Sequence, residues 1–207
     1  MGRVPHSLTP AQAWQLLRDG NQRFVDGMSS HPNQDSARRA ELVETQNPVC
    51  VIFGCSDSRL AAEIIFDLGL GDAFVVRSAG HVIDEAVLGS LEYAIEPLNV
   101  PLIVVLGHDS CGAVTASVEA YETGEMPQGF VRDLVERIMP SVLTAQRNGI
   151  TDVDNTVVEH AKQTGGRLLE TSQIIAKAVE EGRTAVLGVC YHLAEGKAEL
   201  VSKIGEV

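Results

Sequence analysis

Short apolar segments recur along the chain after Pro48, and they alternate with segments that have helical periodicity. The apolar segments are rich in β-branched residues and comprise Val49–Phe53, Ala73–Val76, Leu102–Leu106 and Thr184–Val189. The helical segments comprise Leu60–Leu68, Glu85–Leu98, Ala113–Thr123 and a long stretch, Val153–Glu181. Near-continuous apolar strands that alternate with helices are typical of a buried parallel sheet. The pattern therefore predicts an α/β fold: a mostly parallel central β-sheet flanked by helices, in a Rossmann-like order.

The N-terminal part of the chain lacks these strands. A helix is predicted over Thr9–Phe24, because a threonine that can cap it and a proline stand at its start. A second, polar helix is expected at about residues 35–46. We expect this N-terminal helical arm, about residues 1–47, to contribute little to the core and to pack on a partner subunit.

The rest of the chain, about residues 48–207, is expected to form the α/β core of a single domain that spans residues 1–207. In its final segment, YHLAEGKAELVSKI, the turn residues Glu195 and Gly196 separate two apolar runs. This arrangement predicts a terminal hairpin, whose last strand adds antiparallel at one edge of the sheet.

Composition and charge exclude several classes of protein. Of 207 residues, 44% are hydrophobic and 21% charged, which is typical of a globular chain. Acidic residues outnumber basic ones by 28 to 16, and a net charge of −12 disfavours nucleic-acid binding. No apolar run is long enough to span a bilayer or to act as a secretory signal, so we expect no membrane association, a cytoplasmic location and reduced cysteines.

Two predicted strands end in clusters of polar side chains. The run VCVIFG is followed by CSDSR, and LIVVLG is followed by HDSCG. Ligands of open parallel sheets gather at the carboxyl ends of strands, so Cys55, His108 and Cys111 would converge if these strands are neighbours. Two thiolates and one imidazole suit zinc, and three protein ligands leave a fourth position for water, as in catalytic sites.

Asp57 and Arg59 follow Cys55 and form a candidate catalytic pair. Two thiolates neutralise the charge of zinc, so bound water loses its proton less readily than it would with three neutral ligands. Arg59 can pair with Asp57, which would orient that carboxylate and keep it off the metal. Asp57 can then accept a hydrogen bond from zinc-bound hydroxide.

Other interpretations of the same residues stay open. Asp57 could be a fourth ligand, which would close the site and give a non-catalytic zinc protein. Cys50 and Cys190 are expected to be core residues, whereas His81 and His160 are either core or solvated histidines or members of a proton relay. The sequence contains no Cys-x-x-Cys pair and no glycine-rich nucleotide motif, which disfavours a thiol redox protein and a nucleotide cofactor.

With CSDSR followed by HDSCG, the sequence resembles the β-class carbonic anhydrases. The resemblance extends through AEIIFDLGLGDAFVVRSAG, SLEYAI and GVCYHLAEGK, and so covers nearly the whole chain from the first helix onward. It implies reversible hydration of CO2 to bicarbonate and a proton by zinc-hydroxide attack. One Zn²⁺ per chain would be bound by Cys55, His108 and Cys111, with Asp57 and Arg59 as the catalytic dyad. A carbonyl sulfide or carbon disulfide hydrolase on the same scaffold remains an alternative.

The resemblance also implies a substrate site. Gln46 falls where members of the family with a permanently open site hydrogen-bond the substrate. Phe74, Ala79 and Tyr93 fall where the family lines an apolar pocket, partly from a neighbouring subunit, and the backbone N–H of Gly112 would approach the substrate. Since family members are dimers or assemblies of dimers, we expect a homodimer or homotetramer.

One departure from the family pattern concerns regulation. Some members close the site at low pH, when the dyad aspartate moves onto zinc and bicarbonate occupies a pocket of Trp, Arg and Tyr. Arg77 and Tyr191 match two of these positions, but Ile52 stands at the tryptophan position. We therefore expect weak bicarbonate binding there and an open site at neutral pH, with Asp57 off the metal.

Overall fold

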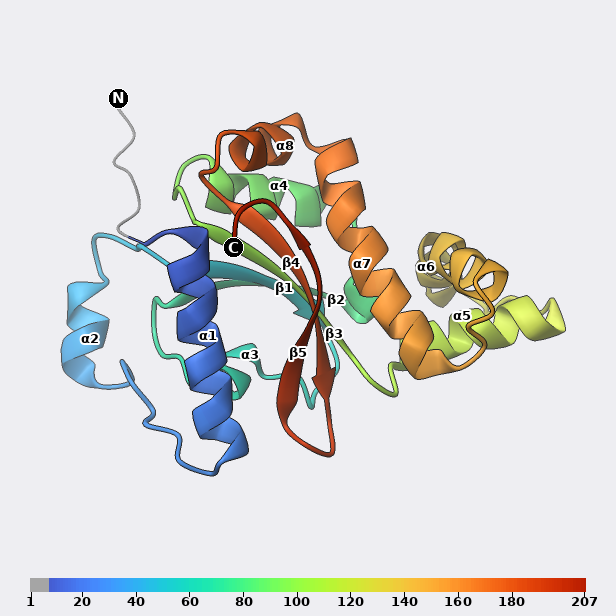
Figure 1. Ribbon diagram of the computed structural model, residues 1–207, viewed down its shortest axis with the longest axis horizontal. Coiled ribbons are helices and arrows are strands. Elements are labelled where there is room, and N and C mark those ends of the chain that lie inside the picture. Colours follow the sequence, from blue (N-terminus) through green and yellow to red (C-terminus); the bar gives the residue numbers. More distant parts are fainter. Residues whose placement is uncertain (1–7) are drawn as a thin grey trace.

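A five-stranded sheet forms the centre of the computed structural model, which describes residues 8–207 (Figure 1). In this part of the chain the strands lie in the order β2-β1-β3-β4-β5. The first four are parallel and β5 is antiparallel to β4, so the predicted mostly parallel α/β fold and its antiparallel edge strand are confirmed. The bounds are β1 (Cys50–Cys55), β2 (Ala73–Ser78), β3 (Leu102–His108), β4 (Ala185–His192) and β5 (Lys197–Ile204).

The strand order reverses direction next to β1. This strand pairs with β2 on one side and with β3 on the other, in parallel register. The carboxyl ends of β1 and β3, at Cys55 and His108, therefore lie side by side at one edge of the sheet. Such a reversal leaves a crevice beyond the strand ends, which is where open α/β sheets bind ligands.

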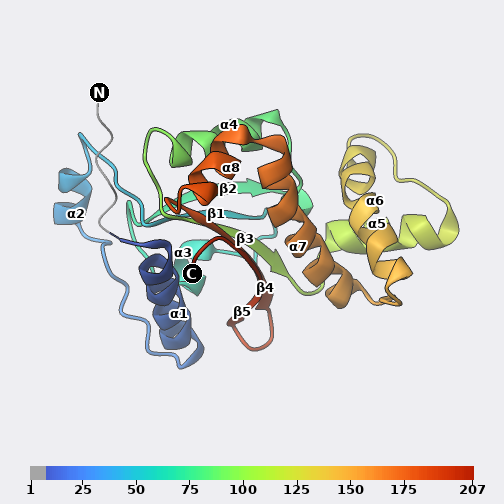
Figure 2. The same cartoon turned by 45° about the horizontal axis from the view of Figure 1, so that its top comes forward.

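Helices cover both faces of the sheet and extend beyond its end (Figures 1 and 2). One face packs against α4 (Glu85–Ile95), α7 (Val153–Thr171) and α8 (Gln173–Glu180). The other face packs against α1 (Pro10–Val25) and α3 (Ala62–Ile65). Three further elements are α2 (Ser36–Glu41), α5 (Gly112–Thr123) and α6 (Val131–Arg147), and a 3₁₀ turn, Ala79–His81, follows β2. None of the helices described is long and apolar enough to cross a membrane.

Helix α1 contributes directly to the core. Its residues Ala13, Trp14 and Leu17 are buried in the cluster that contains Ile52 of β1. The helix approaches α3 so closely that a Cβ on Gly20 would lie 1.9 Å from the carbonyl oxygen of Phe66. The expectation that the arm contributes little core is therefore wrong for α1, because one face of this helix is apolar at intervals of three to four residues. Residues 1–7 of the proposed arm lie outside the described residues.

Two helical features differ from the sequence-based expectation. Helix α6 has no counterpart in that expectation, and it contains Pro140 at an interior position, where proline normally disfavours a helix. It forms nevertheless, because Val135, Ile138 and Val142 bury one face against the core. The long stretch Val153–Glu181 is two helices, since Ser172 leaves the helical conformation and its hydroxyl caps α8 through the N–H of Ile175.

Asp67 fastens the segment that follows α1 to the rest of the domain. Its buried carboxylate accepts hydrogen bonds from the Nε of Arg23 (2.6 Å), from the backbone N–H and hydroxyl of Ser30, and from the N–H of His31. Although burial by itself would raise the pKa of Asp67, these donors hold it well below its ordinary value. The charged form is therefore the one that stabilises the fold.

We expect Asp67→Asn to lower the free energy of unfolding by about 2–3 kcal/mol at pH 7, because an amide cannot replace the charged acceptor. The pKa of Asp67 is depressed in the folded state, so its contribution is complete above the unfolded pKa of 3.8 and is lost as the pH falls below it. Urea unfolding at one protein concentration should thus show a large difference from the wild type at pH 7 and a smaller one at pH 3. An equal difference at both pH values would contradict this role of the charge.

Candidate metal centre

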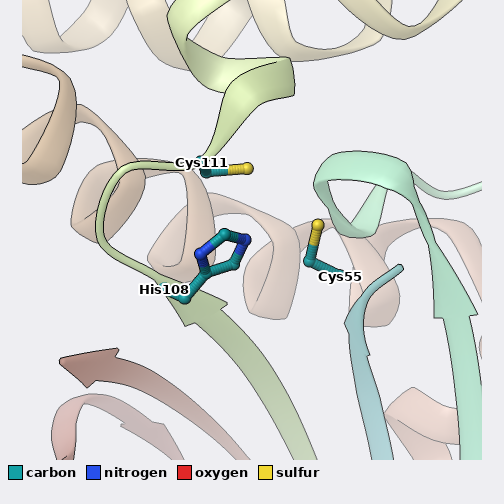
Figure 3. Close-up of side chains that lie close together, drawn as sticks. All are labelled: Cys55, His108 and Cys111. Atoms are coloured by element: carbon teal, nitrogen blue, oxygen red, sulfur yellow. The ribbon is translucent and has the colours of Figure 1, made fainter. Parts of the chain in front are cut away.

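Three potential metal ligands converge at the carboxyl edge of the sheet. Cys55 ends β1, His108 ends β3, and Cys111 immediately precedes α5. Their ligand atoms all lie within 4.8 Å of one another, and all three residues are buried. Figure 3 shows the two sulfur atoms and the imidazole ring facing a common point. The predicted convergence of these three residues is confirmed, because β1 and β3 are neighbours.

The imidazole of His108 is oriented for a metal. Its Nδ1 lies 2.8 Å from the backbone carbonyl oxygen of Asp109, to which it can donate. Its Nε2 is buried and has no hydrogen-bond partner in the described part of the chain. A buried polar atom without a partner is costly, and a bound cation beside the two sulfur atoms would satisfy it. The residues present therefore fit a zinc ion, which takes sulfur and nitrogen ligands.

The two thiols interact strongly with each other. The neighbouring Cys111 thiol lowers the pKa of Cys55, with further lowering by His108 and by the backbone N–H groups of Asp57 and Gly80. The same interaction, together with burial, raises the pKa of Cys111. In the metal-free pair, Cys55 therefore loses its proton more readily than Cys111 does. A divalent cation would displace the proton of Cys111 and be bound by both thiolates.

Gly80 supports the Cys55 sulfur with its backbone. Its N–H donates to Cys55 Sγ over 3.2 Å, and its carbonyl oxygen lies 2.9 Å from Nε2 of His160. Its φ of 64° is in the left-handed region, and a Cβ there would lie 2.8 Å from Ile138 Cδ1 and 2.9 Å from Ala113 Cβ. The sequence indicates only a turn at this glycine, and its contact with a ligand is evident only in the structure.

We expect Gly80→Ala to destabilise the fold by about 1–3 kcal/mol and to weaken metal binding, because both the strain and the crowding act at the peptide that contacts Cys55. Gly89→Ala is the matched control: Gly89 lies in α4 and a Cβ there would meet nothing within 4 Å. It should stabilise the helix by about 0.5–1 kcal/mol. Thermal unfolding and competition with a zinc chelator measure both effects, and equal zinc affinity in the two variants would contradict the role of Gly80.

Asp57 and Arg59 form a closely paired dyad beside the three ligands. Arg59 donates from Nε to Oδ1 of Asp57 (2.9 Å) and from Nη2 to Oδ2 (2.8 Å). The guanidinium holds the pKa of Asp57 well below its usual range. Oδ2 of Asp57 also lies 3.9 Å from His108 Nε2, so the carboxylate faces the ligand cluster while it is held by Arg59.

Arg77 positions the loop that carries Cys55 and Asp57. Its Nε donates to the carbonyl oxygen of Cys55 (2.9 Å), and its Nη2 donates to the carbonyl oxygen of Asp57 (2.6 Å). The Arg77 guanidinium, at a position expected for a bicarbonate pocket, is thus engaged by the backbone. Ile52, at the tryptophan position of that pocket, is fully buried in β1, two strands from Tyr191. The positioning contact of Arg77 is not evident from the sequence, since it depends on β2 pairing with β1.

The candidate substrate residues divide into two groups. Gly112 directly follows Cys111, and Ala79 is adjacent to the glycine that contacts Cys55, so both lie near the cluster. Phe74 pairs with Val51, whereas Cys55 pairs with Ser78, four residues further along β2. Phe74 is therefore roughly 13 Å from the strand end that carries Cys55. Phe74 contacts the half-exposed Tyr93, with ring centroids 6.1 Å apart, and Gln46 is exposed before β1 begins. Within one described chain Phe74 and Tyr93 are therefore not brought to the cluster.

The remaining cysteines and two histidines are core residues. Cys50 and Cys190 are free and buried, as expected, and burial raises the pKa of each thiol. His81 and His160 are buried and stack with ring centroids 4.5 Å apart. Burial lowers the pKa of His160 to about 4, so it is neutral near pH 7.

Comparison with known proteins identifies the family. A family model described as carbonic anhydrase matches residues 50–198, which include the whole ligand cluster. The chain belongs to the carbonic anhydrase family. A carbonic anhydrase of Mycolicibacterium smegmatis is 54% identical over 204 residues, covering 99% of this chain and 98% of its own. The predicted membership of a family of enzymes is thereby confirmed.

Solved carbonic anhydrase structures share the fold. The β-carbonic anhydrase CcaA is 25% identical, with a TM-score of 0.73 over 94% of this chain and 92% of its own. A tetrameric β-carbonic anhydrase of Sordaria macrospora has a TM-score of 0.72 at 22% identity, over 90% of this chain and 95% of its own. The resemblance to the β class is therefore confirmed at the level of the fold.

Proposed function

We propose that this protein is a zinc-dependent carbonic anhydrase that catalyses the reversible hydration of CO2 to bicarbonate and a proton. The observation that carries the proposal is the unpartnered, buried Nε2 of His108 between two thiols, with the Asp57 carboxylate 3.9 Å away. Cys55, His108 and Cys111 would hold one Zn²⁺ per chain. Membership of the carbonic anhydrase family supports this assignment.

Zinc, when bound, supplies a nucleophilic water at near-neutral pH. The protein's task is then to orient that water and to admit CO2. Asp57 accepts a hydrogen bond from the attacking water, and Arg59 fixes the carboxylate by two hydrogen bonds. The N–H of Gly112, at the first turn of α5, is free to approach a substrate oxygen.

The substrate pocket is proposed to be completed by a second subunit. Phe74 and Tyr93 contact each other away from the cluster of their own chain, and the Tyr93 side chain is exposed. Such an apolar pair, together with Gln46, could line the pocket of a partner, which suits a substrate that offers little to hydrogen-bond. We accordingly propose a homodimer or homotetramer, which the tetrameric state of the Sordaria macrospora enzyme supports. A cytoplasmic location is likewise a proposal.

The site is proposed to stay open at neutral pH. Asp57 is engaged by Arg59, and the Arg77 guanidinium is engaged by two backbone carbonyl oxygens. With Ile52 in place of an indole donor, little remains to bind bicarbonate beside Tyr191.

Comparison of substrates tests this function. Zinc-loaded protein should hydrate CO2 much faster than it hydrolyses carbonyl sulfide or carbon disulfide, in stopped-flow assays at the same pH. Faster turnover of either sulfur compound would favour a hydrolase on the same scaffold. Bound zinc with no turnover of any of the three substrates between pH 6.5 and 9 would favour a non-catalytic zinc protein, closed by Asp57.

A further inference from the structure

A second pocket lies away from the candidate metal centre, between α4, α6 and α7. Its volume is about 430 Å³, within the range typical of small-molecule sites. Figure 2 shows α7 between α4 and α6. Its lining includes two arginines, Arg137 and Arg167, and the buried His160. The apolar residues of the lining are Val82, Ile83, Leu88 and Pro140.

Neither arginine of this pocket forms an ion pair within the described residues. Five other arginines do, although the chain has 28 acidic residues for 16 basic ones. Among residues 8–207, Arg137 donates to the carbonyl oxygen of Ile83 alone, over 2.8 Å. Arg167 donates to the carbonyl oxygen of Arg137 (3.2 Å), to Ser141 Oγ (3.3 Å) and to Gln163 Oε1 (3.0 Å). Each guanidinium has five N–H donors, so donors remain free on both.

We propose that this pocket binds a small organic anion through a carboxylate or phosphate group held by Arg137 and Arg167. The planar fork of a guanidinium matches both groups, and a half-buried arginine without a counter-ion gains from one. Asp84 and Glu85 also line the pocket, beside the Ile83 carbonyl oxygen that accepts from Arg137, and Asp84 caps α4 through the N–H of Val87. The anionic group is therefore placed toward Arg167 on α7, away from these carboxylates, and the rest of the ligand contacts the apolar residues of the lining.

A chain of hydrogen bonds connects this pocket to the candidate metal centre. Arg167 contacts Ser141 Oγ, which lies 2.9 Å from Nδ1 of His160. Nε2 of His160 lies 2.9 Å from the carbonyl oxygen of Gly80, whose N–H donates to Cys55. An anion that draws Arg167 away from Ser141 would shift this series of hydrogen bonds, which ends at Cys55. Occupancy of the pocket is therefore expected to alter turnover. This second part of the proposal rests on the proposed function; anion binding itself does not.

Calorimetry with the zinc-loaded protein tests the binding, with inorganic phosphate and succinate as separate probes. We expect at least one probe to bind once per chain with a dissociation constant below about 1 mM. Arg137→Gln/Arg167→Gln should weaken binding by more than about tenfold, since charged hydrogen bonds are lost. Arg137→Gln alone, at an exposed side chain, keeps the contacts of Arg167 and should weaken binding in the same direction. Arg147→Gln, exposed on the same helix and outside the pocket, should leave binding unchanged.

Two results would overturn the anion site. One is no binding of either probe up to about 10 mM. The other is equal binding by the wild type and the double variant, as expected for an anion at the metal instead. Stopped-flow CO2 hydration tests the coupling: a saturating probe should change the rate of the wild type and not of the double variant. Binding with an unchanged rate would overturn the coupling, whereas no hydration by any variant would overturn the proposed function and leave the calorimetry valid.

Discussion

Cys111→Ser should remove bound zinc and CO2 hydration together. The cluster offers two sulfur atoms and one imidazole, and a hydroxyl is a far poorer zinc ligand than a thiolate. Changes to groups that merely orient metal ligands cost about 10–100-fold in affinity, so loss of a ligand should cost at least about 100-fold. Zinc content after dialysis and stopped-flow hydration measure the two effects. Purified Cys111→Ser protein with full zinc and normal turnover would show that Cys111 is not a ligand.

Cys190→Ser is the matched control for that experiment. Cys190 is equally buried and free, but it lies in β4 outside the cluster. The same exchange of sulfur for oxygen there should lower stability modestly and leave one zinc per chain. Loss of zinc in both variants would mean that the loss reflects general unfolding and not ligation.

Asp57→Asn should abolish most of the turnover while zinc stays bound. The carboxylate accepts three hydrogen bonds from Arg59, one from its backbone N–H and two from its guanidinium, and it faces the ligand cluster. An amide cannot keep both guanidinium bonds while also accepting one from water. Correct placement of such a proton acceptor is worth about 10²–10⁴ in rate, so kcat/KM should decrease by a factor in that range. Asp133→Asn, in the exposed first turn of α6, removes the same charge and should retain normal kcat/KM.

The pH dependence of this variant provides a second readout. Arg59 holds the pKa of Asp57 well below its usual range, so the carboxylate is charged throughout pH 6.5–9. The loss caused by Asp57→Asn should therefore be nearly constant over that interval. A loss that disappears at either end of the interval would contradict the assigned role.

The strands of the sheet and the ligand cluster could be predicted from the sequence for a physical reason. A buried parallel strand such as β1 or β3 is apolar along its whole length, so the polar residues after it mark the strand end. Cys55 and His108 are such residues. Once the strands are neighbours, the parallel register brings these residues together without further information.

Other parts of the structure depend on tertiary contacts that have no local signal. Helix α6 tolerates Pro140 because its apolar face is buried, and α1 joins the core because the sheet presents a complementary face. The contact of Gly80 with Cys55 and those of Arg77 with two carbonyl oxygens require β2 to lie beside β1. The hydrogen bond from the Arg167 guanidinium to the carbonyl oxygen of Arg137 similarly requires α6 to pack on α7.

Titration of the metal-free protein with zinc, with CO2 hydration measured at each step, tests most directly whether the cluster of Cys55, His108 and Cys111 makes this protein a carbonic anhydrase. We expect the hydration rate to rise in proportion to added zinc and to reach a plateau at one zinc per chain. A rate that stays at the uncatalysed level after one equivalent of zinc has bound would contradict the proposed function.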